Sequence, residues 1–551
     1  MNLCIKTFLV GAIGGFALTA CAMTPVLPPD SARPRLVVLL IVDGLPQRQV
    51  LAYRDQLAPD GLARFLDRGT WFANAHYTHA YTVTGPGHAT VLTGATPSRS
   101  GIIGNEWRDP LSGERVTCTA DTSATYIGHK THALDGTSPR NLKVQSVGDV
   151  LRGLDPRSKV IAVAGKDRGA ILPAGKLGTA YMYMAGTGQF ASSTYYMKEH
   201  PAWVNAFNAA QPADRYFREQ WTALRPPADY ARSLPDNQTW FGPAGGGLPM
   251  AYSAAQDEVP GPRYYGALLR GPFQDQMSLA FARAAIVAEE LGRDDAPDIL
   301  SIGLSGHDYV NHAFGAESRL SHDHTLQLDL MLQSFFKDLD QLVGRDRYVA
   351  LLTADHGFMP VPEHSAALGL EAGRINSAQL LSRLNGAMQA RFGEGQWLLG
   401  YSGSSLLLNR KLIAQRRVDE RDLAEAARAL LMLEPGLGAA YTRAELRSAT
   451  TGAPFFEALR NAWHAEISGD IQFALKPNWL FGSGMSGTTH GSPHPYDTHV
   501  PLLIYGPKWS GPGRIDAPVA VVDIAPTVSR WLGIAAPDAS QGRALALPAP
   551  Q

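Results

Sequence analysis

Continuous apolar runs recur along this chain, and each ends in a short polar or glycine-containing segment. The first is RLVVLLIVDG at residues 35–44, and similar runs occupy residues 159–165, 297–306, 347–357 and 498–507. An apolar run of this length without polar alternation predicts a strand buried on both faces, as in a parallel sheet covered by helices. Helical periodicity lies between these runs, at residues 57–67, 275–291 and 324–343. The alternation predicts an α/β fold with a central, mostly parallel sheet flanked by helices.

Two long stretches, residues 170–265 and 365–485, interrupt this pattern. The first is rich in Gly, Pro, Tyr and Trp, and the second contains helical runs at residues 423–433 and 455–465. We interpret both as inserted cap subdomains that cover the carboxyl ends of the strands and shape the substrate pocket. The two insertions would then belong to one catalytic domain over residues 35–545.

Polar side chains stand at the ends of four predicted strands: Asp43, Lys166, Asp308 and Asp355. In an open α/β sheet, ligands bind beyond the carboxyl ends of the strands, where the ends of neighbouring strands meet. We therefore expect these four residues, although they are spread over some 300 positions of the chain, to converge on one site.

The composition limits the class of function. The chain has 551 residues, of which 45% are hydrophobic and 18% charged, and its formal net charge is -1. Such a chain can bury a large core, and it has neither the basic surface of a nucleic-acid-binding protein nor an acidic tail. We expect a globular enzyme, a monomer, that acts on small molecules and has no nucleic-acid partner.

The N-terminus predicts export. Residues 1–20 resemble a signal peptide, because the apolar run at residues 7–20 is too short to span a bilayer. The LTAC sequence that ends at Cys21 resembles a bacterial lipobox, which implies cleavage before Cys21 and a lipid anchor on its thiol. The alternative is an ordinary secretory signal cut near Ala20 or Ala22. Both interpretations export the protein, and the first predicts a periplasmic enzyme anchored in a bacterial envelope membrane.

A flexible tether follows the signal peptide. Residues 21–34 are rich in Pro, Ala and Ser, and folding is expected to begin at Arg35. After cleavage the chain would keep only Cys21 and Cys118. An exported protein can form disulfides, but this one has no obvious pair, so we expect its stability to come from its core and from metal ions.

Thr84 is the candidate nucleophile. It follows the aromatic and β-branched residues 81–83 and precedes the Gly-Pro-Gly sequence at 85–87, so we expect a strand that breaks into a tight turn and holds the hydroxyl out of the sheet. A hydroxyl attacks poorly unless a base or a metal ion activates it. No order of Ser, His and Asp suggests the base. The alternative is that Thr84 merely caps a helix that begins near Gly87.

Four clusters provide candidate metal ligands. Asp308 and His312 are four residues apart, which places both on one face of a helical turn. Asp355 and His356 are adjacent at a predicted strand-to-loop break, His490 lies in a Gly/Ser/Thr loop, and Asp43 ends the first strand. Mixed carboxylate and imidazole ligands suit Zn²⁺, with Mn²⁺ and Co²⁺ as alternatives.

In their order and local context, these motifs resemble the alkaline phosphatase superfamily, within the type I phosphodiesterase/nucleotide pyrophosphatase branch that includes PafA-type alkaline phosphatases with a threonine nucleophile. The resemblance extends over most of residues 36–537. It implies two Zn²⁺ ions, and it implies that Thr84 forms a phosphothreonine. One ion would be held by Asp43, Thr84, Asp355 and His356, and the other by Asp308, His312 and His490.

Three further residues are candidates for substrate binding. Lys166 and Arg168 are two positions apart in a segment predicted to be extended, so both side chains would project to the same side. Asn105, in the GNEW turn, offers a neutral amide donor. In the resembled phosphatases a Lys, an Arg and an Asn in these contexts bind the transferred phosphoryl group and favour monoesters.

The sequence therefore predicts an exported, zinc-dependent alkaline phosphatase that hydrolyses phosphate monoesters. The main alternative is a phosphodiesterase or nucleotide pyrophosphatase, which would have an apolar pocket for the second ester group in place of the cationic pair. A sulfatase would need a modified Cys or Ser, which Thr84 cannot become, and the last alternative is a non-catalytic lipoprotein that binds zinc or phosphate. We expect neighbouring polar residues to lie outside the metal site, namely His88, His307, His322, His324, Asp329 and His494.

Overall fold

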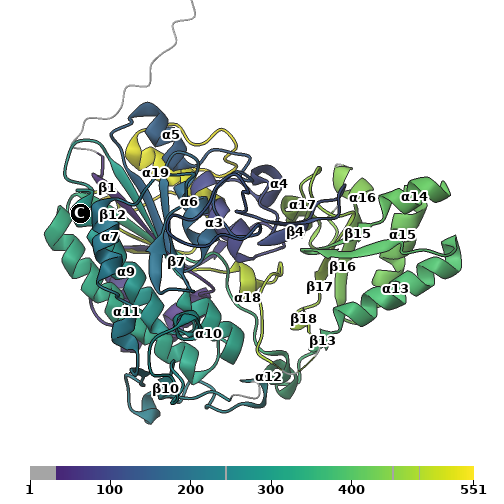
Figure 1. The fold of residues 1–551 in the computed structure, drawn as a ribbon, viewed down its shortest axis with the longest axis horizontal. Helices are drawn as coiled ribbons and strands as arrows, with labels where there is room; N and C mark the ends of the chain where they lie inside the picture. The colour runs from purple at the N-terminus through teal and green to yellow at the C-terminus, as the bar shows by residue number, and fades with distance from the viewer. Residues whose placement is uncertain (1–32, 242–244, 449–451, 483, 485, 551) are drawn as a thin grey trace, which may run out of the picture.

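A nine-stranded sheet forms the centre of the larger of two α/β units in the computed structural model, which describes residues 33–241, 245–448, 452–482, 484 and 486–550 (Figure 1). In sheet order the strands are β20 (Gly513–Ile515), β2 (Thr70–Phe72), β19 (Leu502–Tyr505), β12 (Tyr348–Thr353), β1 (Leu36–Val42), β11 (Asp298–Leu304), β6 (Val160–Ala164), β7 (Thr179–Met184) and β8 (Gln189–Ala191). The four central pairings, from β12 through β1, β11 and β6 to β7, are parallel, and so is the edge pairing of β2 with β20. β19 pairs antiparallel with β12 and β2, and β8 pairs antiparallel with β7.

Two groups of helices cover this sheet. The first contains α7 (Ala202–Ala209), α9 (Pro272–Ala288), α10 (Gly306–Phe314) and α11 (Arg319–Leu339), and the second contains α3 (Thr84–Thr93), α5 (Val147–Leu154), α6 (Asp167–Ala174) and α19 (Ile524–Leu532) (Figure 1). Every residue of β1, β11 and β12 is buried. This burial explains why these strands read as unbroken apolar runs, and it confirms the predicted fold class.

The five predicted strands are all present, and the predicted helices differ at their ends. The helix predicted at residues 57–67 is α2 (Leu62–Arg68), which begins later because Pro59 and Gly61 precede it. α9 begins three residues earlier than predicted, with Pro272 in its first turn, where a missing N–H is tolerated. The helix predicted at 324–343 is α11, followed by a π-helical turn over Asp340–Gly344.

The smaller unit has its own sheet and core. Its four antiparallel strands follow the order β14 (Leu398–Ser402), β15 (Ser405–Leu408), β17 (Ile471–Leu475) and β16 (Leu437–Thr442). Helices α13 (Ser377–Phe392), α14 (Arg410–Arg416) and α15 (Glu420–Leu431) pack around a separate apolar cluster. A parallel pair, β13 (Gly373–Ile375) with β18 (Trp479–Phe481), lies where this unit meets the larger one (Figure 1). The whole unit falls within residues 365–485, the second predicted insertion.

The first predicted insertion, residues 170–265, has a mixed structure. It begins inside α6 and includes β7 and β8, so the central sheet extends further along the chain than the sequence pattern indicated. β7 contains two tyrosines and two methionines, which concealed it among the irregular residues around it. From residue 192 onward the segment is outside the central sheet and forms short helices, turns and a small antiparallel pair, β9 (Gln220–Trp221) with β10 (Met250–Ala251).

The predicted signal peptide and most of the predicted tether, residues 1–32, lie outside the described residues. Within the described ranges, no helix combines the length and the apolar composition that crossing a membrane requires.

Candidate functional site

Three neighbouring strands bring the predicted metal ligands to one edge of the sheet. β1 lies between β11 and β12 and runs parallel to both. Asp43 directly follows β1, Asp308 lies in the first turn of α10 just after β11, and Asp355 with His356 follows β12. His490 comes from a distant loop, and His312 lies one helical turn beyond Asp308. The structure thus brings together ligands that are more than 400 residues apart.

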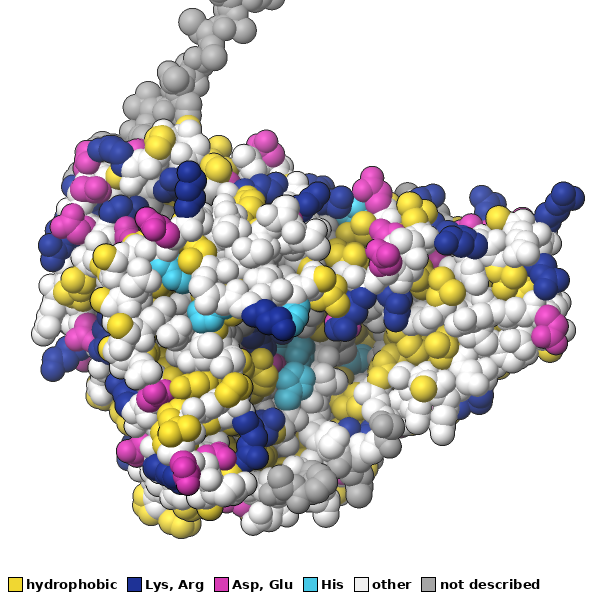
Figure 2. Space-filling model, viewed as in Figure 1, with side chains coloured by type: hydrophobic (Ala, Val, Ile, Leu, Met, Phe, Trp, Pro, Cys, Tyr) yellow, Lys and Arg dark blue, Asp and Glu magenta, His cyan; other side chains and the backbone are white. Residues whose placement is uncertain are grey.

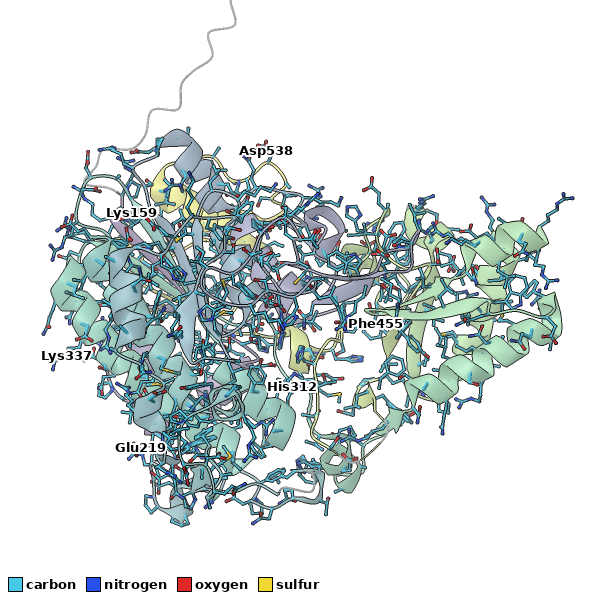
Figure 3. The ribbon with its side chains drawn as sticks, viewed as in Figure 1. Lys159, Glu219, His312, Lys337, Phe455 and Asp538 are labelled. Carbon is cyan, nitrogen blue, oxygen red and sulfur yellow. The ribbon has the colours of Figure 1, made fainter. Side chains whose placement is uncertain are left out.

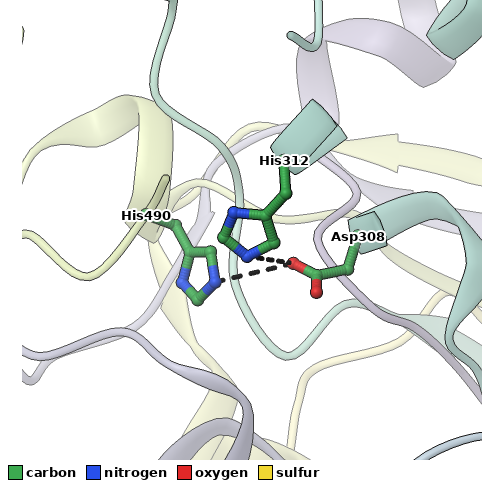
Figure 4. A group of neighbouring side chains, drawn as sticks. All are labelled: Asp308, His312 and His490. Atoms are coloured by element: carbon green, nitrogen blue, oxygen red, sulfur yellow. Dashed lines mark ion pairs between the residues drawn. The ribbon is translucent and has the colours of Figure 1, made fainter. Parts of the chain in front are cut away.

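The ligand atoms form two overlapping groups. In the first, one atom each of Asp308, His312 and His490 lie within 4.8 Å of one another (Figure 4). Oδ1 of Asp308 is 3.4 Å from Nε2 of His312 and 3.5 Å from Nε2 of His490. The second group contains Asp43, Asp308 and His356. Asp355 adjoins it, with its Oδ2 atom 3.4 Å from Nε2 of His356. Asp308 is therefore common to both groups.

The three histidines are held in the same way. Nδ1 of His312 is 2.9 Å from the Thr488 carbonyl, Nδ1 of His490 is 2.9 Å from the Thr82 carbonyl, and Nδ1 of His356 is 2.9 Å from the Gly357 carbonyl. A carbonyl oxygen can only accept, so Nδ1 carries the proton and Nε2 presents a lone pair toward the carboxylates. This backbone support is typical of metal-binding histidines.

Several ligand atoms are buried and have no hydrogen-bond partner among the described residues: Oδ1 of Asp43, Oδ1 of Asp308, Oδ2 of Asp355 and Nε2 of His356. Burying acceptors without partners is unfavourable. Burial, together with the nearby charge of Asp355, raises the pKa of Asp43 well above its usual value. A divalent cation among these atoms would satisfy the acceptors and offset the repulsion, so the residues present fit a metal centre.

Thr84 begins a helix instead of ending a strand. α3 starts at Thr84 with Val83 as its N-cap, so the strand predicted at residues 81–83 was wrong. α3 also packs tightly on the metal-ligand segment, because a Cβ atom at Gly87 would lie 2.1 Å from the Asp355 carbonyl oxygen. Glycine is needed for this close approach. No described residue forms a hydrogen bond with the Thr84 hydroxyl, which leaves the hydroxyl free at the helix N-terminus.

Asn105 is fixed by the same helix. Its Oδ1 atom accepts a hydrogen bond from the Gly85 N–H at 2.6 Å. Because the amide oxygen is used in this way, the NH₂ group faces away from α3 and can donate elsewhere. Asn105 lines a cavity of about 710 Å³ that also contains Lys166, Arg168 and Tyr309. The predicted substrate-binding residues therefore share one space.

Lys166 and Arg168 reach this cavity by a different geometry from the one predicted. Lys166 is extended, but it is the N-cap of α6, and Arg168 lies in the first helical turn. The expectation of one extended segment was wrong, because Asp167 in the first turn favours a helix start. Lys166 Nζ lies 2.6 Å from Oδ2 of Asp43 and 2.5 Å from Oδ2 of Asp308. The guanidinium group of Arg168 keeps an unused donor, because its buried Nε atom has no hydrogen-bond partner among the described residues.

The site opens between the two units. His312 projects into the space between the larger and smaller units (Figure 3), and its side chain is 38% exposed. Histidine, Lys and Arg side chains gather in the hollow there (Figure 2). Thr84, Asp43 and His356, by contrast, are buried. A small anionic substrate could therefore enter from this hollow and meet positive charge at its floor.

Comparison of the chain with known protein families agrees with this geometry. The model of the type I phosphodiesterase / nucleotide pyrophosphatase family matches residues 37–497. The chain belongs to this family. The matched segment includes every predicted site residue, from Asp43 to His490, and the match confirms the resemblance that the motifs indicated.

Several named relatives of this phosphodiesterase-family protein are alkaline phosphatases. Alkaline phosphatase PafA from Elizabethkingia meningoseptica is 32% identical over 546 residues, which is 98% of each chain. Alkaline phosphatase PhoV from Synechococcus elongatus is 33% identical over 531 residues, 94% of each chain. The crystal structure of wild-type PafA has a TM-score of 0.86 and 31% identity, covering 93% of this chain and 98% of that one. The protein is accordingly a phosphoric ester hydrolase.

His88 is a neighbour of the site that the sequence did not indicate. His88 lies four residues after Thr84, and its Nδ1 atom is 3.0 Å from the Thr84 carbonyl and 3.3 Å from Oδ2 of Asp355. The spacing of four on one helix was the signal that could have linked it to Thr84. His307 and His324 bond to each other through their Nδ1 atoms at 3.1 Å and belong to neither ligand group of the described residues.

Proposed function

We propose that this protein is an exported, zinc-dependent alkaline phosphatase that hydrolyses phosphate monoesters through a phosphothreonine at Thr84. The observation that carries the proposal is the cluster of buried, unpartnered carboxylate and imidazole atoms next to a cavity that contains Lys166, Arg168 and Asn105. The names of PafA and PhoV support it as well.

The metal would be held by the two ligand groups already described. The mixture of carboxylates with imidazole Nε2 atoms favours Zn²⁺, and two overlapping groups favour two ions. Bound divalent ions would lower the pKa of the Thr84 hydroxyl and neutralise charge on the departing oxygen.

The protein's own residues bind the phosphoryl group and carry out the transfer. The Asn105 amide donates to one non-bridging oxygen, and Lys166 and Arg168 contribute charge-assisted hydrogen bonds to the others. The Thr84 hydroxyl gives its proton to solvent water, Oγ1 attacks phosphorus and the Oγ1–P bond forms. The bond between phosphorus and the leaving oxygen breaks, and that oxygen takes a proton from water to leave as the alcohol. Water then attacks the phosphothreonine, which releases phosphate and regenerates the hydroxyl. The N-terminus of α3 favours the negative charge that the phosphoryl group brings to Thr84.

Export and anchoring belong to the same proposal. A signal peptide over residues 1–20 and a lipid on Cys21 would place a monomeric enzyme in the periplasm, with small phosphorylated compounds as its substrates. Recovery of the full-length protein in the membrane fraction of a bacterial host, and its release to the soluble fraction by Cys21→Ala with altered processing, would test the anchor.

The family description also covers phosphodiesterases, and a rate comparison separates the two activities. We expect the zinc-loaded protein to hydrolyse an aryl phosphate monoester with a kcat/KM at least about 100-fold above that for the matched diester or sulfate, since a cationic pair favours the dianion. A higher rate with the diester would show that the phosphodiesterase alternative is correct.

A further inference from the structure

A second cavity lies beside His490. It has a volume of about 230 Å³, and its walls come from both units. The larger unit contributes Tyr81, Met359 and the loop around His490, and the smaller unit contributes the end of β17 and the strand β18. Tyr81 lines both this cavity and the 710 Å³ cavity that holds the cationic pair. The two spaces are therefore neighbours, one on each side of Tyr81.

The chemistry of the two cavities differs sharply. The described lining of the second cavity includes no Lys or Arg, and it includes the aromatic side chains of Phe473, Trp479 and Phe481. Phe473 and Phe481 meet edge to face, with ring centroids 5.7 Å apart. Such walls disfavour an anion and favour a flat apolar group. A cavity of about 150 Å³ holds a benzene molecule in another protein, so this one is large enough for a single substituted ring.

Trp479 gives the cavity a fixed wall. Its six-membered ring packs closely against two glycines, because Cβ atoms at Gly373 and Gly436 would lie 2.7 Å and 2.5 Å from it. The indole Nε1 atom is on the opposite edge of the side chain. It is buried and has no acceptor among the described residues. Because the protein itself encloses that atom, the cavity meets the indole ring and not its N–H donor, which suits an apolar group.

We propose that this second cavity, lined by Tyr81, Phe473, Trp479, Phe481 and His490, binds the leaving group of the substrate and selects monoesters of aromatic alcohols. The inference rests on the proposed function. In an in-line displacement the leaving oxygen lies opposite Oγ1 of Thr84, while the non-bridging oxygens face Lys166 and Arg168. The leaving group must then extend out of the cationic cavity, and the adjoining apolar space beyond His490 can take it.

The leaving group's own reactivity has to be separated from its binding. Benzyl phosphate and ethyl phosphate both release a primary alkoxide, and they differ mainly in the aromatic ring. Burying that ring should raise kcat/KM for benzyl phosphate above that for ethyl phosphate by about 10- to 100-fold. Aryl phosphates would not give this information, because phenoxide is also the better leaving group.

The blocking variant is Ser404→Phe. Ser404 lies in the turn between β14 and β15 and lines the cavity, so a phenyl group there would fill it without altering the metal ligands or the cationic pair. Leu433→Phe is the control, since it places the same phenyl group on the same unit at a position that is 77% exposed. We expect Ser404→Phe to lower kcat/KM for benzyl phosphate, so that the ratio of kcat/KM for benzyl phosphate to kcat/KM for ethyl phosphate falls to about 1–3. We expect Leu433→Phe to leave this ratio unchanged.

Calorimetric titration of the zinc-loaded wild type with benzylphosphonate and ethylphosphonate gives a second measurement that does not require turnover or the variant. Tighter binding of benzylphosphonate by about 10-fold, lost in Ser404→Phe, supports the subsite. Equal binding of the two phosphonates, or a benzyl preference that survives in a folded Ser404→Phe protein, overturns it. If neither monoester is hydrolysed, the proposed function fails, and the phosphonate titration still decides whether the cavity binds an aromatic ring.

Discussion

Thr84 combines a free hydroxyl, a helix N-terminus and a neighbouring ligand cluster. The structure holds the Thr84 backbone at the start of α3, and Gly87 allows that helix to press against Asp355. These features fix the hydroxyl without using it in a hydrogen bond among the described residues. A hydroxyl that attacks phosphorus must be free in this way.

We predict that Thr84→Ala abolishes phosphoryl transfer while the fold and most of the bound metal remain. In the proposed mechanism the hydroxyl is the attacking group, whereas the cluster keeps its carboxylate and imidazole side chains. Activity toward an aryl phosphate, metal content and circular dichroism provide the measurements. Thr84→Ser is the matched control and should retain substantial activity. Near-normal turnover by the alanine variant would show that water attacks phosphorus directly.

We predict that the double variant Lys166→Ala/Arg168→Ala moves the enzyme toward diesters. Charge-assisted hydrogen bonds contribute roughly 1.5 to 3 kcal/mol each, so monoester kcat/KM should fall by about two to four orders of magnitude, and diester kcat/KM much less. Asn105→Ala should cause a smaller shift in the same direction.

Two controls accompany this test. Lys130→Ala removes an exposed cation from the same cavity and should change both rates little. Metal content must also be measured, because Lys166 contacts Asp43 and Asp308. An equal loss on monoester and diester, at unchanged metal content, would mean that the pair is structural.

At the level of helices and strands, the site is built from three helix starts. α3 begins at Thr84, α6 at Asp167 and α10 at Gly306, and each start lies at a predicted site residue or next to one. Helix N-termini favour negative charge, so the elements themselves suit an anionic substrate. The candidate acidic ligands follow the strand ends, with Asp308 in the first turn of α10, and the starts of α3 and α6 carry the candidate nucleophile and cations.

Asp329 connects α11 to the start of α2 by hydrogen bonds. It is buried in α11, and its two carboxylate oxygens accept from the backbone N–H groups of Ala58 and Leu62, at the start of α2. We predict that Asp329→Ala lowers the free energy of unfolding by about 1–3 kcal/mol, because both donors lose their partner. Thermal and denaturant unfolding provide the measurement, and activity at a temperature where the variant is folded should be preserved.

The same residue predicts a pH dependence. Burial raises the pKa of Asp329 to about 6, above its value of about 4 in an unfolded chain. The folded protein therefore binds this proton more tightly, so the stabilisation from protonation is complete below pH 4 and is lost as the pH rises through about 6. Asp329→Asn should remove that component, and identical pH profiles of wild type and variant would contradict the assignment.

At the scale of the whole protein, the candidate metal ligands join distant segments. They extend from Asp43 to His490, and the loop around His490 lines a cavity whose walls come from both units. Without a cation, several of these buried acceptors have no described partner. Bound metal should therefore stabilise the fold as well as support turnover.

We predict that about two zinc ions bind per chain, and that a chelator abolishes activity and lowers the unfolding temperature, with both restored by zinc. Elemental analysis and differential scanning calorimetry are the measurements. Asp308→Asn should lower metal occupancy most, since Asp308 is common to both ligand groups. Active protein that contains no divalent metal would refute this prediction.

Much of this protein could be predicted from local patterns. The apolar runs predicted the central strands because a strand buried on both faces needs no polar position. Since ligands in an open α/β sheet bind beyond the carboxyl ends of the strands, Asp43, Asp308 and Asp355 could then be predicted to lie at one edge. Asn105, Lys166 and Arg168 were found by motif, and the structure places all three on one cavity. These inferences succeed because they depend on residues close together in the chain and on general sheet geometry.

Other features were decided by contacts between distant segments, which no local pattern encodes. The start of α3 depends on its packing against Asp355, and the position of Lys166 depends on two carboxylates from other strands. Asp308 belongs to both ligand groups because its carboxylate lies within a few ångströms of ligand atoms from other segments. The cavity beside His490 exists only because Tyr81 and β18, some 400 residues apart, meet in the folded chain.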